Sequence, residues 1–121
     1  MKTPTALVIE DDYDAAAIMS AALTAAGYDV AIFHDGAAAR QALATTAPDL
    51  VALDLHLPGV SGDQLLAEIR ADERLADVRV MLVTADDRLA ENIGDDADLV
   101  LLKPVTVAQL RMLAQRLAPK K

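Results

Sequence analysis

Short runs of apolar residues alternate along the chain with longer segments in which apolar residues recur every three or four positions. Uninterrupted short runs are typical of buried strands, and the longer spacing is typical of helices packed on a sheet. Because the two alternate, the sequence predicts an α/β fold with one doubly wound, parallel five-stranded sheet and helices on both faces. The runs cover residues 5–9, 28–33, 50–53, 78–83 and 99–102, and the helical segments cover 13–26, 37–46, 61–71 and a last segment that opens near 106.

Two helix starts carry the spacing of a capping box, in which an N-cap hydroxyl and a side chain three residues later each accept a backbone N–H of the other. These are Ser61 with Gln64, and Thr106 with Gln109. The spacing predicts that helices begin at the serine and at the threonine.

The segment between the fourth and fifth runs has the weakest helical pattern. Residues 86–97 are acidic and contain Gly94. Glycine and like charges one turn apart both weaken a helix. We therefore expect the helix in this segment to be short, shifted or partly disordered.

Composition restricts the class of protein. A chain of 121 residues suits one domain over 1–121, with an ordered core expected at about 4–118. The absence of cysteine excludes disulfides and thiolate metal sites. A net charge of −8 disfavours direct binding to nucleic acid. No apolar stretch has the length of a signal peptide or a membrane span, so we expect a soluble, cytoplasmic protein that does not contact membranes.

Polar residues stand at the carboxyl ends of four of the five expected strands. In an open parallel sheet these ends share one edge, and ligands bind there. The residues are Glu10, Asp11 and Asp12 after the first strand, Asp54 after the third, Thr84 at the end of the fourth, and Lys103 with Pro104 after the fifth. The pattern predicts a single polar site at this edge.

The residue types in this set suit phosphoryl chemistry. Carboxylates brought together repel one another unless a cation joins them, and hard oxygen ligands favour Mg²⁺ or Mn²⁺. A metal with open positions recruits phosphate oxygens, and the Lys103 ammonium and the Thr84 hydroxyl suit a transferring phosphoryl group. The Asp54 carboxylate can also be the nucleophile and form an aspartyl phosphate.

Each residue also has a plainer interpretation. The acidic run 10–12 is a common helix start, because acids favour that end of the helix dipole. Thr84 suits a strand as a β-branched residue, and Lys103 suits a surface with its stem along the sheet. Asp54 could form a turn, although a carboxylate after four apolar residues is costly without a partner. The coincidence of complementary groups at four strand ends favours the site.

The chain resembles the receiver domains of response regulators, the chemotaxis-regulator-like switches of two-component signalling, over nearly its whole length. The matching segments are VIEDD at 8–12, LDLHLPG at 53–59 followed by Gly62, LVTA at 82–85 and LKP at 102–104. The resemblance implies a flavodoxin-like fold with strand order 2-1-3-4-5.

The resemblance also implies a role for each matching position. Glu10 and Asp11 are the metal-binding acids, with Asp12 as a helix cap. Asp54 is the phosphoacceptor and a metal ligand, and the backbone carbonyl of His56 is a further ligand. By the same resemblance, Thr84 and the backbone of Ala85 bind the phosphoryl group, Lys103 pairs with it, and Pro104 suggests a cis peptide bond.

The side chains of His56 and Asp86 occupy positions that modulate dephosphorylation in such domains, and we expect them to meet over the phosphoryl group. Zinc binding by His56 is disfavoured, because the sequence offers no cysteine and no second histidine nearby. His34 is expected to be a surface residue beside the turn at Asp35 and Gly36.

Two features depart from the family pattern. Val100 stands where such domains usually carry a Tyr or Phe that changes rotamer on activation. The segment from Thr84 to Lys103 is shorter than usual by about three residues, under one helical turn. Both changes fall on the surface that normally handles dimerisation and output.

Three functions follow as hypotheses. The first is a phosphorylation switch that accepts a phosphoryl group on Asp54 from a sensor histidine kinase or phosphotransfer protein, with Mg²⁺ or Mn²⁺ and a downstream protein partner that the sequence does not identify. The second is an interaction module with an atypical output face that works without phosphorylation. The third is an aspartyl-phosphate phosphatase, which typically carries a second Asp where this chain has His56. Under the first hypothesis the chain catalyses only its own phosphorylation and dephosphorylation.

Overall fold

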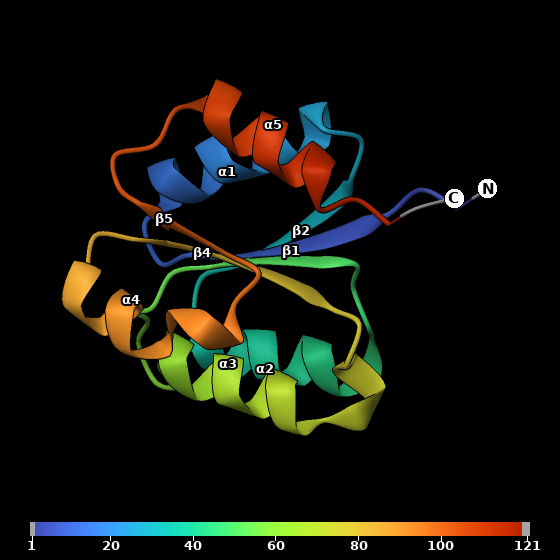
Figure 1. The fold of residues 1–121 in the computed structure, drawn as a ribbon. Coiled ribbons are helices and arrows are strands. Elements are labelled where there is room, and N and C mark those ends of the chain that lie inside the picture. The colour runs from blue at the N-terminus through green and yellow to red at the C-terminus, as the bar shows by residue number, and fades with distance from the viewer. Residues whose placement is uncertain (1, 120–121) are drawn as a thin grey trace.

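The computed structural model describes residues 2–119, so Met1, Lys120 and Lys121 of the expected domain lie outside the described residues. Strands and helices alternate along this part of the chain (Figure 1). The strands are β1 (Thr5–Ile9), β2 (Asp29–Phe33), β3 (Leu50–Leu53), β4 (Arg79–Thr84) and β5 (Leu99–Leu102). The helices are α1 (Tyr13–Ala25), α2 (Gly36–Thr45), α3 (Gly62–Ala71), α4 (Asp87–Ile93) and α5 (Val107–Arg116), with short 3-10 turns η1 (Glu73–Leu75) and η2 (Gly94–Asp96).

The strands of the described chain form one parallel sheet in the order β2-β1-β3-β4-β5, as predicted. Helices α1 and α5 cover one face, and α2, α3 and α4 cover the other (Figure 1). Strand β3 lies in the middle and is wholly buried. Its residues point alternately into the two halves of the core, Val51 and Leu53 toward one and Leu50 and Ala52 toward the other. This burial on both faces explains the uninterrupted apolar run.

The two predicted capping boxes have different outcomes. At α5 the box is complete: the Thr106 hydroxyl accepts the Gln109 N–H, and the Gln109 side chain accepts the Thr106 N–H. At α3 the helix starts as predicted, but the Ser61 side chain makes no capping hydrogen bond with any described residue. The loop after β3 packs against this helix start instead, and the Gly62 N–H donates to the Leu55 carbonyl at 2.9 Å.

Helix α4 is short, as expected, with seven residues, and η2 follows it directly. An ion-pair network fixes the start of β5 below it. Asp98 accepts hydrogen bonds from Arg70 at 2.9 Å and from Arg79 at 3.2 Å, and also from the Val80 N–H. Arg70 additionally donates to the Asp96 carbonyl. Side chains from α3 and β4 therefore hold the end of the connection between β4 and β5 in place.

The face of β5 that points toward α4 is open. Leu99 and Leu101 pack into the core beneath α1 and α5. Val100 and Leu102 point the opposite way, and they are 37% and 49% exposed. The position of the usual aromatic residue is thus an exposed aliphatic side chain. None of the helices within residues 2–119 has both the length and the apolar character needed to cross a membrane.

Tyr28 gives the fold a pH dependence in the alkaline range. Its side chain is buried, and its hydroxyl donates to the Ala114 carbonyl at 2.7 Å. Burial, with a smaller effect of the Asp49 charge, raises the pKa of Tyr28 to about 12. Because the folded protein holds this proton more tightly than the unfolded chain, whose tyrosine pKa is near 10, Tyr28 stabilises the fold below pH 10. This contribution to the free energy of unfolding is lost as the pH rises toward 12.

We therefore expect the free energy of unfolding to fall by about 2 kcal/mol between pH 10 and pH 12 from this residue alone. Urea unfolding at a series of pH values measures it, with Tyr28→Phe as the control because phenylalanine cannot ionise. Equal pH dependence of the native chain and the variant over this interval would contradict the assignment.

Candidate functional site

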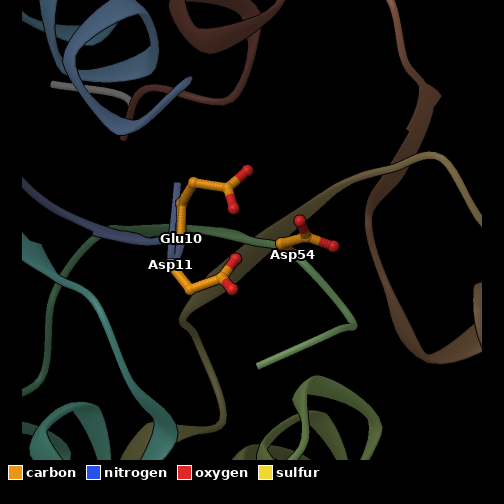
Figure 2. Close-up of side chains that lie close together, drawn as sticks. All are labelled: Glu10, Asp11 and Asp54. Atoms are coloured by element: carbon orange, nitrogen blue, oxygen red, sulfur yellow. The ribbon is translucent and has the colours of Figure 1, made fainter. Parts of the chain in front are cut away.

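Three carboxylates converge at the carboxyl edge of the sheet (Figure 2). Glu10 and Asp11 follow β1, and Asp54 follows the neighbouring β3, whose last residue is in register with that of β1. One oxygen from each carboxylate lies within 4.8 Å of the others. Glu10 and Asp54 are 1% and 6% exposed, whereas Asp11 is exposed. The parallel pairing of two strands therefore builds an acidic cluster with one open side.

Lys103 joins the two buried carboxylates. It follows β5, and its ammonium nitrogen lies 2.5 Å from Glu10 Oε1 and 2.9 Å from Asp54 Oδ2. Its backbone N–H donates to the Thr84 carbonyl at 2.8 Å, and its peptide bond to Pro104 is cis. One ammonium against three carboxylates leaves an excess of two negative charges at the cluster.

The pKa of Asp54 is lowered even though the side chain is buried. Burial by itself acts to raise this pKa, but hydrogen bonds from Lys103 and from the His56 N–H, the latter at 3.2 Å, outweigh it. For Glu10 burial prevails over Lys103 and raises the pKa. The pKa of Lys103 is raised, because its bonds to the two carboxylates outweigh its own desolvation. Asp54 is consequently an anion at neutral pH, as a nucleophilic carboxylate must be.

Thr84 and Ala85 lie at the end of β4, beside the strand that carries Asp54. Thr84 is fully buried, and its hydroxyl accepts the Asp86 N–H at 3.2 Å. Ala85 is exposed. The hydroxyl is therefore fixed at the sheet edge on the side where the chain turns into α4.

His56 and Asp86 meet, as the sequence led us to expect. His56 Nε2 lies 2.7 Å from Asp86 Oδ2, which links the loop after β3 to the loop after β4. The pKa of Asp86 is lowered, first by the Leu89 N–H and then by His56. The pair is solvent-accessible, with the histidine side chain 67% exposed.

His34, which we expected at the surface beside the turn at Asp35 and Gly36, is half-buried. Its Nδ1 lies 3.0 Å from the Glu10 carbonyl oxygen, and its ring stacks on Tyr13 with centroids 3.8 Å apart. Sequence reasoning missed the stack between these two rings, because no local pattern joins position 13 to position 34. Asp12 caps α1 as expected, accepting the N–H groups of Asp14 and Ala15.

The donor set fits a hard divalent cation. Every side-chain group in the cluster is a carboxylate oxygen, which is the ligand type that Mg²⁺ and Mn²⁺ prefer. The two excess negative charges equal the charge of one such ion. Asp11 faces solvent, so the cluster has an open side from which an ion and a phosphoryl group can approach.

Residues 6–115 match the family model described as the response regulator receiver domain. The DNA-binding dual master transcriptional regulator RpaA of Synechocystis is 38% identical, and the match covers 93% of this chain and 50% of that protein. The transcriptional regulatory protein PrrA of Mycobacterium tuberculosis is 34% identical, with 89% of this chain and 47% of that protein covered. The chain thus spans about half the length of the curated relatives it matches.

Solved structures agree with the sequence match. The receiver domain of a sensor histidine kinase from Pseudomonas aeruginosa, with a magnesium ion coordinated in its active-site cleft, has a TM-score of 0.84 at 26% identity, and the match covers 95% of this chain and 97% of that one. The response regulator TrrA from Thermotoga maritima, in complex with Mg²⁺ and BeF, has a TM-score of 0.84 at 25% identity, with 95% and 99% covered. The chain therefore belongs to the response regulator receiver domain family, whose members are phosphorylation-dependent switches of two-component signalling.

Proposed function

We propose that this receiver domain accepts a phosphoryl group on Asp54, in the cytoplasm, from a sensor histidine kinase or a phosphotransfer protein. The observation that carries the proposal is the set of groups around Asp54. An ionised carboxylate stands at the sheet edge beside two further acids, and the Lys103 ammonium bonds both this carboxylate and that of Glu10. This is the arrangement that phosphoryl transfer to a carboxylate requires.

Mg²⁺ or Mn²⁺ is the proposed cofactor. Glu10, Asp11 and Asp54 would hold it, together with the backbone carbonyl of His56. When bound, the ion neutralises the negative charge of phosphate oxygens. Two related receiver structures contain magnesium, which supports the choice of ion.

The reaction at Asp54 is an in-line displacement. A carboxylate oxygen forms the new phosphorus–oxygen bond, and the phosphorus–nitrogen bond of the donor phosphohistidine breaks, with the electron pair leaving on the imidazole. Lys103 pairs with the transferred group. The Thr84 hydroxyl and the Ala85 N–H donate to its oxygens, so the charge is met by fixed donors.

Phosphorylation of Asp54 changes the structure by moving the residues that bind the phosphoryl group. Thr84 contacts the Asp86 N–H at the start of the α4 connection, and Lys103 lies next to Pro104 before α5. A phosphoryl group that draws these two residues together shifts both connections at once. With Val100 in place of an aromatic residue, the signal leaves through these connections toward a downstream protein partner. The acidic net charge of −8 disfavours nucleic acid as the direct partner.

Phosphorylation of the native chain by acetyl phosphate tests the proposal. With Mg²⁺ present, intact mass spectrometry is expected to show the gain of one phosphoryl group, and EDTA is expected to abolish it. Steady release of phosphate from a generic ester such as p-nitrophenyl phosphate is not expected, because His56 stands where a phosphatase carries its acid. No mass gain would favour a module that works without phosphorylation, and sustained ester turnover would favour a phosphatase.

The His56–Asp86 pair is expected to slow hydrolysis of the aspartyl phosphate. The pair bridges the two loops that flank the site, so its loss allows water easier access. We expect His56→Ala and Asp86→Ala each to shorten the lifetime of the phosphorylated chain several-fold, Asp86→Ala by somewhat more because it also removes the side-chain hydrogen bond from the Leu89 N–H. The double variant is expected to add little to the effect of Asp86→Ala, because both single changes remove the His56–Asp86 contact. Decay of the phosphorylated mass after removal of donor measures this. Fully additive effects, or slower decay, would contradict the bridging role.

A further inference from the structure

Two helix starts press against the loop that carries the reactive residues. We call residues 54–61 the site loop; it contains Asp54 and His56 and joins β3 to α3. The first helix start is that of α2, which comes from a distant part of the chain. Gly36, its first residue, is buried and donates its N–H to the Pro58 carbonyl at 3.4 Å.

Gly36 has no room for a side chain. A methyl group at this position would overlap the Val60 carbonyl oxygen and would lie 2.7 Å from the Val60 carbonyl carbon. Both obstacles are backbone atoms of the site loop, so no side-chain rotation relieves the clash. The start of α2 is therefore in direct backbone contact with the loop that holds the acceptor.

Gly62 makes an equivalent contact at the other end of the loop. Its N–H donates to the Leu55 carbonyl at 2.9 Å. A methyl group here would overlap the Asp54 carbonyl oxygen and would lie 2.5 Å from the Leu55 Cα. Gly62 thus rests against the peptide bond that immediately follows the acceptor aspartate.

The two other glycines for which the structure gives the surroundings differ in kind. Gly27 and Gly59 have φ angles of +103° and +75°, and a methyl group on either would meet no atom of residues 2–119 within 4 Å. These positions use the left-handed backbone conformation that glycine tolerates. Close approach of the backbone is the requirement at Gly36 and Gly62.

The position of the site loop determines the position of the reactive groups, because residues of the loop hydrogen-bond them. The His56 N–H bonds Asp54 Oδ1 at 3.2 Å, and the His56 ring reaches Asp86. A shift of the loop by the size of a methyl group would disturb both contacts. Asp35 holds the α2 start in place, because its side chain caps the helix by accepting the Ala38 N–H at 2.8 Å.

We propose that Gly36 and Gly62 are positioning residues for the phosphorylation of Asp54, clamping the site loop between the starts of α2 and α3. The proposal rests on the proposed function of Asp54. Gly36 is the more informative of the two, because it lies outside the loop, on a different helix, and contacts neither Asp54 nor the other acids in the cluster through a hydrogen bond that the structure records.

The test compares Gly36→Ala with Gly27→Ala. Both replace glycine by alanine at a costly position, but only the first presses on the site loop. The rate of phosphorylation at saturating acetyl phosphate and Mg²⁺ is measured at a temperature where circular dichroism shows both variants folded. We expect about a tenfold or greater loss of rate for Gly36→Ala, since small displacements of reacting groups are costly, and a native rate for Gly27→Ala. A folded Gly36→Ala with a native rate, or an equal loss in Gly27→Ala, overturns the proposal.

If Gly36→Ala does not fold, Asp35→Ala tests the proposal instead. This variant keeps Gly36 but removes the side-chain cap at the start of α2, and we expect it to lower the phosphorylation rate by a smaller factor than Gly36→Ala. A native phosphorylation rate in Asp35→Ala overturns the proposal. A native chain that gains no phosphoryl group refutes the proposed function instead. The positioning role is then tested by the affinity of each variant for Mg²⁺ alone. We expect weaker Mg²⁺ binding in the Gly36→Ala or Asp35→Ala chain, because Asp54 is displaced there, and native affinity in Gly27→Ala.

Discussion

Asp54→Asn is expected to lose all Mg²⁺-dependent gain of a phosphoryl group. The native carboxylate is kept ionised by Lys103 and by the His56 N–H, and of the two acids that bond the Lys103 ammonium it is the one that follows the middle strand, β3. An amide of the same shape has no anionic oxygen to attack phosphorus. Incubation with acetyl phosphate followed by intact mass spectrometry measures the effect.

Asp49→Asn is the matched control for this change. Asp49 precedes β3 at the opposite end of the strand, where its side chain accepts the Thr5 N–H, and it lies outside the acidic cluster. We expect this variant to gain one phosphoryl group at the native rate. An Asp54→Asn chain that is modified as fast as the Asp49 variant would refute Asp54 as the acceptor.

Lys103→Met is expected to destabilise the metal-free fold by about 3 kcal/mol, because it leaves two buried carboxylates without their common cation. Methionine retains the length of the stem but not the charge. Glu10 and Asp54 are 1% and 6% exposed, so water replaces the ammonium poorly. Mg²⁺ is expected to restore most of the loss, since a divalent cation at the same carboxylates supplies the missing charge.

The pH dependence gives this prediction a second readout. Lys103 contributes to the lowered pKa of Asp54, and a lowered pKa stabilises the fold above the unfolded-state pKa of about 4. That contribution is lost as the pH falls through the folded-state pKa, so the difference between native and variant is expected to shrink in acid. Urea unfolding with EDTA and with Mg²⁺, at neutral and acidic pH, measures both effects. Equal stability of the two chains in EDTA at neutral pH would show that the ion pairs contribute nothing.

The sheet and the position of the site were predictable from the sequence, because both follow from local patterns. Apolar runs mark the strands, and parallel strands place their carboxyl ends at one edge. Asp54 and Lys103 could therefore be placed in one site although 49 positions separate them. The strand order itself came from the family resemblance, since periodicity does not say which strands are neighbours.

The features that were missed depend on how distant elements pack. The Tyr13–His34 stack forms because α1 starts beside the end of β2, and nothing near either residue signals it. Ser61 has the spacing of a cap but makes no capping bond where the site loop packs on the helix start. Gly36 follows an aspartate as an ordinary turn glycine does, and its contact with Val60 emerges only from the tertiary structure.

Binding of Mg²⁺ to the native chain and to Asp11→Asn tests most directly whether the three carboxylates form one metal site. Asp11 is exposed, so its replacement leaves the packing intact, and Asp14→Asn is a control with an exposed acid nearby that lies outside the cluster. Calorimetric titration is expected to show one ion bound by the native chain and by Asp14→Asn, with affinity at least about tenfold weaker in Asp11→Asn. Native affinity in the Asp11 variant, or no binding to the native chain, would contradict the account.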